Sequence, residues 1–140
     1  MPTNLLQQHG NPERRAVLKA GRVAVPILLH KTVTADLIWR ALPLHSIAET
    51  WGGSLHFDTP LRTGRDRTAR LNARPGDVCF WAEDERIVIV WGGTPISGAG
   101  EIRLMRPCNI WAHALEDASA FSKVTPGEKV VLEKARAGKA

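Results

Sequence analysis

Aromatic side chains are the first candidates for binding chemistry in this sequence. Five tryptophans and three phenylalanines occur among 140 residues, and there is no tyrosine. Large rings together with a few polar groups are typical of small-molecule sites. Trp51 and Trp81 stand beside predicted turns, so we expect them at the rim of a pocket, whereas Trp91 lies in an apolar run and is expected in the core. The other residues predicted to line the pocket are His56, Phe57, Thr94 and Asn109.

Two of these polar residues have a structural interpretation as well. Side chains of Thr94 and Asn109, and of the nearby Ser97, are of types that commonly hydrogen-bond to the backbone of turns. Thr94 and Asn109 are therefore predicted either to stabilise turns or to contact a ligand.

His56 is the histidine most suggestive of acid–base chemistry. It alternates with Leu55 and Phe57, so its side chain faces the opposite side of the predicted strand. If that side is the mouth of a barrel, His56 and Glu49 across the predicted hairpin would form an acid–base pair. The alternative is an exposed histidine that pairs with a carboxylate.

No metal, cofactor or catalytic nucleophile is predicted. No two histidines have the H-x-H or H-E-x-x-H spacing of metal ligands. Cys79 and Cys108 each lie in a strand-like segment and are expected to be buried thiols. Ser97 is not in a G-x-S-x-G motif, because position 95 is proline.

Positive charge is concentrated in residues 61–74. The whole chain has a formal net charge of +5, and this segment holds five arginines opposed only by Asp66. Arg62 and Arg65 are predicted to steer an anionic partner toward the pocket, although a solvated loop has the same composition. Nucleic acid is a less favoured partner, because no binding motif accompanies the arginines and the aromatic residues do not interleave with them.

The composition indicates one globular domain. Hydrophobic residues make up 44% of the chain and charged residues 24%. The longest apolar run, residues 87–91, is far shorter than the ~20 residues of a membrane helix, and the first residues lack the pattern of a signal peptide. Two cysteines are too few for a disulfide framework, so a cytoplasmic location is expected. We assign residues 1–13 to a flexible lead-in, 14–134 to the folded domain and 135–140 to a frayed tail.

The elements that position these residues are predicted to be short strands. About eight are expected, separated by turn signals at the spacing typical of a closed barrel or a sandwich. They cover residues 16–18, 23–29, 47–51, 55–57, 78–81, 87–91, 101–104, 109–114 and 129–133, and a hairpin is predicted at Gly52–Gly53. One short helix is predicted at about 35–42, capped by Thr34 and ended by Pro43. A further helical turn is expected near 117–123.

Four motifs in order resemble a family of small prokaryotic cyclophilin-like proteins. They are TWGGSLHF (residues 50–57), RPGDVCFW (74–81), VIVWGGTPIS (88–97) and RPCNIWAH (106–113). The resemblance covers roughly residues 15–134 and implies a mainly β, small closed barrel with cyclophilin-like topology and a helix that closes one end. It implies no reaction. The sequence departs from the family pattern at Gly53, Ser54, His56 and residues 82–84, so its pocket chemistry is expected to differ.

These observations together predict a cyclophilin-like domain that binds a small organic ligand or a peptide segment at an aromatic pocket. Peptidyl-prolyl isomerase is the enzymatic alternative. The Phe-His-Arg and Gln-Gly-Gly-Asp stretches that carry activity in cyclophilins are absent, and only Arg62, Arg65 or Arg103 would substitute. A basic-loop module that docks nucleic acid or protein is the other alternative. Edge strands or the aromatic rim would also support a homodimer.

Overall fold

Short strands with alternating side chains make up most of the fold. The structure is a computed structural model that describes residues 13–136, so residues 1–12 of the predicted lead-in and 137–140 of the predicted tail lie outside it. The described elements in chain order are β1 (Arg15–Ala20), β2 (Val23–Leu29), α2 (Val33–Ala41), β3 (Leu44–Ile47), β4 (Glu49–Thr50), β5 (Ser54–Asp58), β6 (Arg70–Ala73), β7 (Asp77–Trp81), β8 (Arg86–Val90), β9 (Ile102–Ala114), the 3-10 helix η1 (Ala118–Lys123) and β10 (Lys129–Lys134). None of the helices within 13–136 has the length and apolar character that a membrane span requires.

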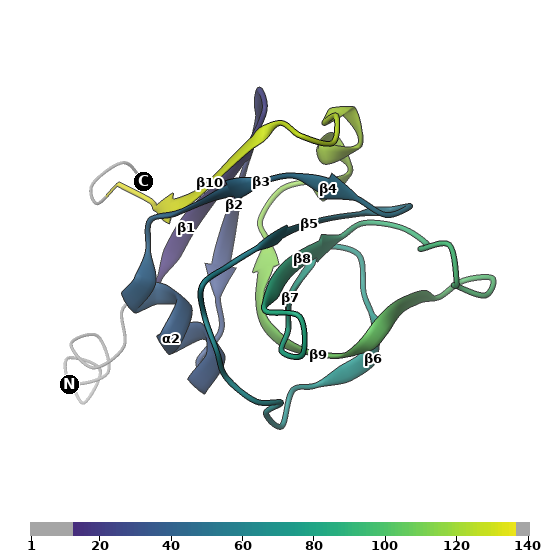
Figure 1. Ribbon diagram of the computed structural model, residues 1–140, viewed down its shortest axis with the longest axis horizontal. Helices are drawn as coiled ribbons and strands as arrows, with labels where there is room; N and C mark the ends of the chain where they lie inside the picture. The colour runs from purple at the N-terminus through teal and green to yellow at the C-terminus, as the bar shows by residue number, and fades with distance from the viewer. Residues whose placement is uncertain (1–12, 137–140) are drawn as a thin grey trace, which may run out of the picture.

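The strands form one antiparallel sheet that curls round on itself (Figure 1). Its order is β3-β10-β1-β2-β9-β7-β8-β5-β4, and β6 pairs with β9 outside this path. The two ends of that order, β3 and β4, are consecutive in the chain and only Ala48 separates them. Residues 44–50 therefore pair with β10 on one side and with β5 on the other. The predicted mainly β fold is confirmed, as a curled sheet of ten described strands whose two ends meet in one segment.

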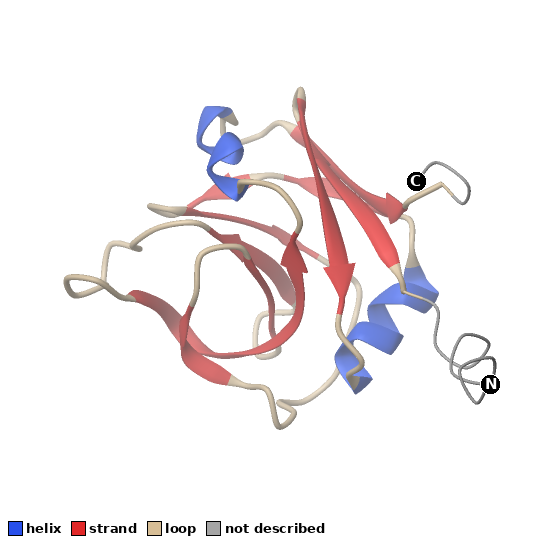
Figure 2. Cartoon of the chain, turned by 180° about the vertical axis from the view of Figure 1, so that it is seen from behind, coloured by secondary structure: helices blue, strands red, loops and turns tan. Residues whose placement is uncertain are grey.

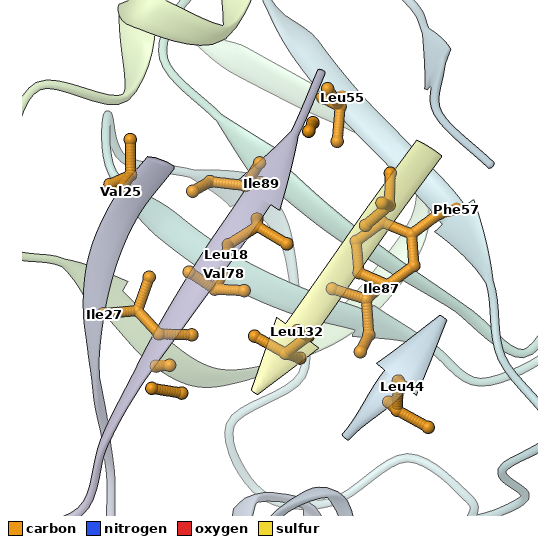
Figure 3. Close-up of a cluster of buried hydrophobic side chains, with 14 of the residues drawn as sticks. Leu18, Val25, Ile27, Leu44, Leu55, Phe57, Val78, Ile87, Ile89 and Leu132 are labelled. Atoms are coloured by element: carbon orange, nitrogen blue, oxygen red, sulfur yellow. The ribbon is translucent and has the colours of Figure 1, made fainter. Parts of the chain in front are cut away.

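The main core fills the inside of the curled sheet (Figure 3). Alternate residues of β5 and β8 point inward, so that Phe57 lies opposite Ile87, and Ile87 lies opposite Phe80 of β7. All three side chains are fully buried. The period of two in a strand then leaves the intervening residues on the outer face. Helix α2 and η1 lie on opposite sides of the molecule in both views (Figures 1 and 2), and both contribute buried side chains to the main core.

A second apolar cluster lies on the outer face of β7 and β8. Strand β9 is 13 residues long and bends (Figure 1), so its first half and β6 cover this face. The buried members of the cluster are Cys79, Val88, Val90, Ile102, Leu104, Cys108 and Ile110. Both faces of β7 and β8 are therefore apolar and covered, which explains the continuous hydrophobic run at 87–91.

Three local predictions need correction. The helix begins at Val33, and its N-cap is Thr32, whose hydroxyl accepts a hydrogen bond from the Ala35 amide at 3.0 Å. Thr34, the predicted cap, is fully buried, and its hydroxyl donates to the Asp66 carboxylate. The segments 101–104 and 109–114 form the single strand β9, because a register irregularity in its pairing with β6 accommodates Pro107, which has no amide proton to donate. Strand β6 lies in the segment assigned to a loop. The Gly52–Gly53 hairpin and the helical turn near 117–123 are confirmed.

Candidate functional site

A cavity of about 240 Å³ lies on the outer face of the sheet, beside the second apolar cluster. Its volume is just below the roughly 300–1,000 Å³ of sites for drug-sized ligands. The lining residues come from β4, β5, β7, β8, β9 and two adjoining turns, and they are Glu49, Trp51, His56, Trp81, Asp84, Arg86, Val88, Leu104, Met105 and Cys108. A ligand of this cavity would be a small fragment or a single side chain of a peptide.

Strand register explains how the sheet side of the cavity is built. Glu49 on β4 lies opposite His56 on β5, and His56 lies opposite Val88 on β8. Since residues opposite one another on neighbouring strands share a face, these three form one row on the outer side of the sheet. Arg86 and Trp81 are partners in the adjacent row. The bent first half of β9 supplies the facing wall.

The Gly52–Gly53 hairpin fixes the position of Trp51. Gly52 has a φ of +60°, which glycine adopts without strain. The Gly53 amide donates to the Gly93 carbonyl at 2.8 Å, and a Cβ at Gly53 would lie 2.5 Å from the carbonyl carbon of Gly92. Glycine is therefore required at this position for the hairpin to pack against residues 92 and 93 and hold Trp51 at the cavity.

Most of the cavity wall is apolar. It consists of the rings of Trp51 and Trp81 with the side chains of Val88, Leu104, Met105 and Cys108. Burial raises the pKa of the Cys108 thiol to about 12, so this group is neutral. The Trp81 indole nitrogen is covered and has no hydrogen-bond partner among the described residues. Trp81 therefore presents carbon surface to the cavity.

One end of the cavity is charged, and Arg86 is at its centre. The guanidinium donates to Asp84 at 2.8 Å and to Glu49 at 3.1 Å, and its Nη2 lies 3.1 Å from Asp58. Burial lowers the pKa of Arg86, but the hydrogen bond to Asp84 and the charges of Asp58 and Glu49 outweigh it and raise that pKa overall. Arg86 is therefore a permanent cation. Within residues 13–136, no three histidine, cysteine or acidic side chains are grouped so as to hold a metal ion.

His56 completes the charged end as a neutral ring. Its Nδ1 lies 3.2 Å from Nη1 of Arg86. An arginine can only donate, so Nδ1 accepts and the ring proton is on Nε2. Burial lowers the pKa of His56 and the Arg86 charge lowers it further, while Glu49, Asp84 and Asp58 oppose this shift. The imidazole is thus held in one tautomer near neutral pH.

Comparison with known proteins identifies the fold family. Residues 14–133 match the profile of the cyclophilin-like family. The chain belongs to this family. A solved structure, the solution structure of the hypothetical protein AF2241 from Archaeoglobus fulgidus, is similar over 90% of this chain and 99% of that one, with a TM-score of 0.77 and 27% sequence identity. No curated protein matches the sequence significantly. The resemblance expected from the four motifs is confirmed.

Three of the predicted ligand-binding residues of this cyclophilin-like domain lie together at the cavity. They are Trp51, His56 and Trp81. Phe57 is absent from the lining because it follows His56 on the same strand and points to the main core, where it is fully buried. Along the regular strand β5, alternation directs Phe57 away from the side that His56 occupies.

Asn109 lies away from the cavity and anchors a loop. It is fully buried, and its side-chain amide donates to the Thr34 hydroxyl at 2.9 Å and to the Gly64 carbonyl at 3.0 Å. Its side-chain carbonyl accepts from the Asp66 amide at 2.8 Å. The Asp66 carboxylate in turn accepts from Thr34 and Thr68. These contacts fix the loop before β6 against α2 and β9.

Thr94 is likewise engaged in local structure. Its hydroxyl donates to the Arg103 carbonyl at 2.5 Å, and its amide donates to the Ser97 hydroxyl at 2.9 Å. The amide of Arg103 donates to the same Ser97 hydroxyl at 2.8 Å. Thr94 therefore joins the turn after β8 to β9 and does not line the cavity.

The two arginines expected to steer anions are paired with carboxylates. Arg62 lies 2.8 Å from Glu85, and Arg65 lies 2.6 Å from Glu83. Both carboxylates belong to the acidic turn between β7 and β8, so this turn offsets two of the five positive charges of residues 61–74. Neither arginine lines the cavity.

Arg86 and the wall formed by β9 were not among the residues predicted from the sequence. A signal for Arg86 was present, since it precedes an apolar strand and shares a face with Val88 two residues later. Three acidic residues directly before it are natural partners for a cation. Leu104 and Met105 had no comparable signal, because their place depends on the bend of β9 over another part of the sheet.

Proposed function

We propose that this cyclophilin-like domain binds a small organic ligand, or one side chain of a peptide segment, in the outer-face cavity. The observation that carries the proposal is the combination of two tryptophans and an aliphatic wall with a charged end formed by Arg86 and its partners. Apolar walls with a few fixed polar groups are the usual composition of ligand sites. The proposal assigns no reaction.

Peptidyl-prolyl isomerisation is less well supported as a function of this cavity. Its barrier of ~20 kcal/mol is lowered by a donor placed at the prolyl nitrogen. Arg86 is the arginine at the cavity, and three of its five N–H groups already donate to Asp84, Glu49 and His56. Its Nη2 also faces Asp58. The N–H groups left for a prolyl nitrogen are therefore those of Nη2, which lies against this carboxylate.

A nucleic-acid or protein-docking role for the basic segment is also less well supported. The ion pairs of Arg62 and Arg65 with the acidic turn reduce the charge that these side chains offer to phosphates. A binding affinity that falls steeply between low and moderate salt would favour this alternative.

The proposal is tested by nuclear magnetic resonance with a library of small aromatic and aliphatic fragments. Binding at the cavity is expected to shift the indole N–H signals of Trp51 and Trp81. The signal of Trp111, which is fully buried in the main core, should stay unchanged. A library that shifts neither signal would contradict the proposal.

A blocking variant makes this test specific. Met105 lines the cavity and is 46% exposed, so Met105→Trp is expected to obstruct the cavity and abolish the shifts. Ile96 is also 46% exposed and lies outside the lining, so Ile96→Trp is the matched control. Loss of binding in both variants, or in neither, would place the ligand elsewhere.

A further inference from the structure

We infer that the ligand of this cavity carries a positive charge on an apolar body, such as an amine attached to an aromatic ring. This inference rests on the proposed function and specifies the ligand class of the same site. It follows from the balance of charge at the polar end, from the hydrogen bonds that Arg86 already makes, and from the nature of the wall.

The charge balance at the polar end is negative. Arg86 contributes one positive charge, and Glu49, Asp84 and Asp58 lie within 3.1 Å of its guanidinium nitrogens. His56 accepts a hydrogen bond from Arg86 and is uncharged in this state. The five side chains together therefore carry a net charge of −2, although the chain as a whole is positive. Asp58 is outside the cavity lining, and the four side chains that line the cavity carry a net charge of −1.

The carboxylates, and not Arg86, are the groups open to a ligand. The Arg86 side chain is only 15% exposed, whereas those of Glu49 and Asp84 are 51% and 52% exposed. Three N–H groups of Arg86 are already engaged. A carboxylate or phosphate ligand would face the like charges of Glu49 and Asp84 in the lining and find few free donors. An ammonium group would find carboxylate oxygens that retain free lone pairs.

The aromatic wall favours the same chemistry. Trp51 and Trp81 line the cavity together with the charged end. A cation close to the face of an indole ring is attracted by the negative charge of that face, and tryptophan is the strongest of the aromatic residues in this respect. The volume of about 240 Å³ accommodates one ring with a short arm, since a water molecule takes up about 30 Å³ of liquid.

Three probes of matched shape test the inference. They are 2-phenylethylamine, 2-phenylethanol and 3-phenylpropionate, which carry a positive, a zero and a negative charge at neutral pH. We expect the amine to bind about fivefold more tightly than the alcohol at low salt, and the carboxylate to bind least tightly. The preference for the amine is expected to shrink as salt is added. Affinities are obtained from the shifts of the Trp51 and Trp81 indole signals.

Variants attribute the preference to the charged end. Glu49→Gln is expected to reduce the ratio of amine to alcohol affinity at least about twofold, and the affinity for the alcohol reports whether the cavity is intact. Glu116→Gln removes the same charge from an exposed position outside the lining and is expected to leave the ratio unchanged.

The outcomes separate the two proposals. Equal binding of the three probes, or tighter binding of the carboxylate, overturns the charge inference and leaves the ligand cavity in place. If the amine binds but shifts signals other than those of Trp51 and Trp81, the inference is also overturned. If none of the three probes binds while another fragment does, the ligand class is wrong; if no fragment of the library binds, both proposals fail.

Discussion

Nη1 of Arg86 lies 3.2 Å from Nδ1 of His56, on the outer face of two neighbouring strands. The two residues are diagonal neighbours, since His56 is paired with Val88 and Arg86 with Asp58. Protonation of Nδ1 would place a second positive charge beside the guanidinium and break this hydrogen bond. The contact therefore links the charge of His56 to the arginine that organises the polar end of the cavity.

Arg86→Gln is predicted to raise the pKa of His56. Burial lowers this pKa and Arg86 lowers it further, whereas Glu49, Asp84 and Asp58 act in the opposite direction. Removal of the guanidinium leaves the carboxylates unopposed, so the imidazolium form gains stability. A titration of the His56 ring signals by nuclear magnetic resonance between pH 4 and 8 measures the change.

Arg22→Gln is the control for this titration. Arg22 is exposed in the turn between β1 and β2, away from the cavity. Arg22→Gln removes the same positive charge as Arg86→Gln and is expected to leave the pKa of His56 unchanged. A His56 pKa that stays constant or falls in Arg86→Gln would contradict the proposed coupling.

The free energy of unfolding is predicted to decrease as the pH falls below about 6.5. Burial lowers the pKa of His30, and the nearby His113, whose Nδ1 is 2.8 Å from Nε2 of His30, lowers it further. The unfolded chain therefore binds a proton at a higher pH than the folded chain does. Stability is lost from the unfolded-state pKa downward, until the lowered folded-state pKa is reached. His56 contributes in the same direction.

Urea unfolding between pH 5 and 7.5 measures this dependence. In His30→Gln the titrating group is absent, so the slope of stability against pH should become shallower. His45→Gln, at an exposed position on β3, is the comparison variant. An unchanged slope in His30→Gln would show that the pair of histidines does not cause the effect.

Local patterns predicted the parts of the fold that neighbours in sequence determine. The two glycines at 52 and 53 predicted the hairpin, and the alternation around them correctly placed His56 and Phe57 on opposite sides of β5. That same alternation excludes Phe57 from the site to which its aromatic ring had assigned it. Residue type alone was thus a poorer guide to the lining than the direction of the side chain.

Contacts between distant segments could not be predicted in this way. Asn109 is 75 residues from Thr34, and nothing near either residue indicates their hydrogen bond. The cover that β9 provides over the outer face of β7 and β8 depends on the bend of one long strand around Pro107. Three of the ten lining residues, Leu104, Met105 and Cys108, come from this strand. Only the sheet side of the site was therefore predictable from local sequence patterns.

Asn109→Ala is predicted to destabilise the fold by about 3 kcal/mol, because it removes three hydrogen bonds from a fully buried position and leaves their partners unsatisfied. The loop at residues 64–68 should then exchange its amide protons faster than in the unaltered protein. Asn72→Ala, on the exposed strand position of β6, is expected to change stability by less than about 0.5 kcal/mol. Equal effects of the two substitutions would contradict the anchoring role.

Both thiols of the folded protein are predicted to resist alkylation. Burial raises the pKa of Cys108 to about 12. Burial, together with the nearby Cys108, also raises the pKa of Cys79 well above the ordinary value. At pH 8 only about one Cys108 thiol in ten thousand would be the reactive thiolate. The Cys108 sulfur also donates to the Arg106 carbonyl at 3.2 Å. Iodoacetamide should therefore modify neither residue until denaturant unfolds the chain.

Single-thiol variants separate the two sites. Cys79→Ala leaves Cys108, which lines the cavity, and Cys108→Ala leaves Cys79, which is fully buried. If Cys79→Ala reacts in the folded state and Cys108→Ala does not, the reagent reaches Cys108 through the cavity, and the neutral character inferred for that wall is wrong. Mass spectrometry of protein modified at several urea concentrations distinguishes this direct reaction from reaction after unfolding, since only the latter follows the unfolding transition.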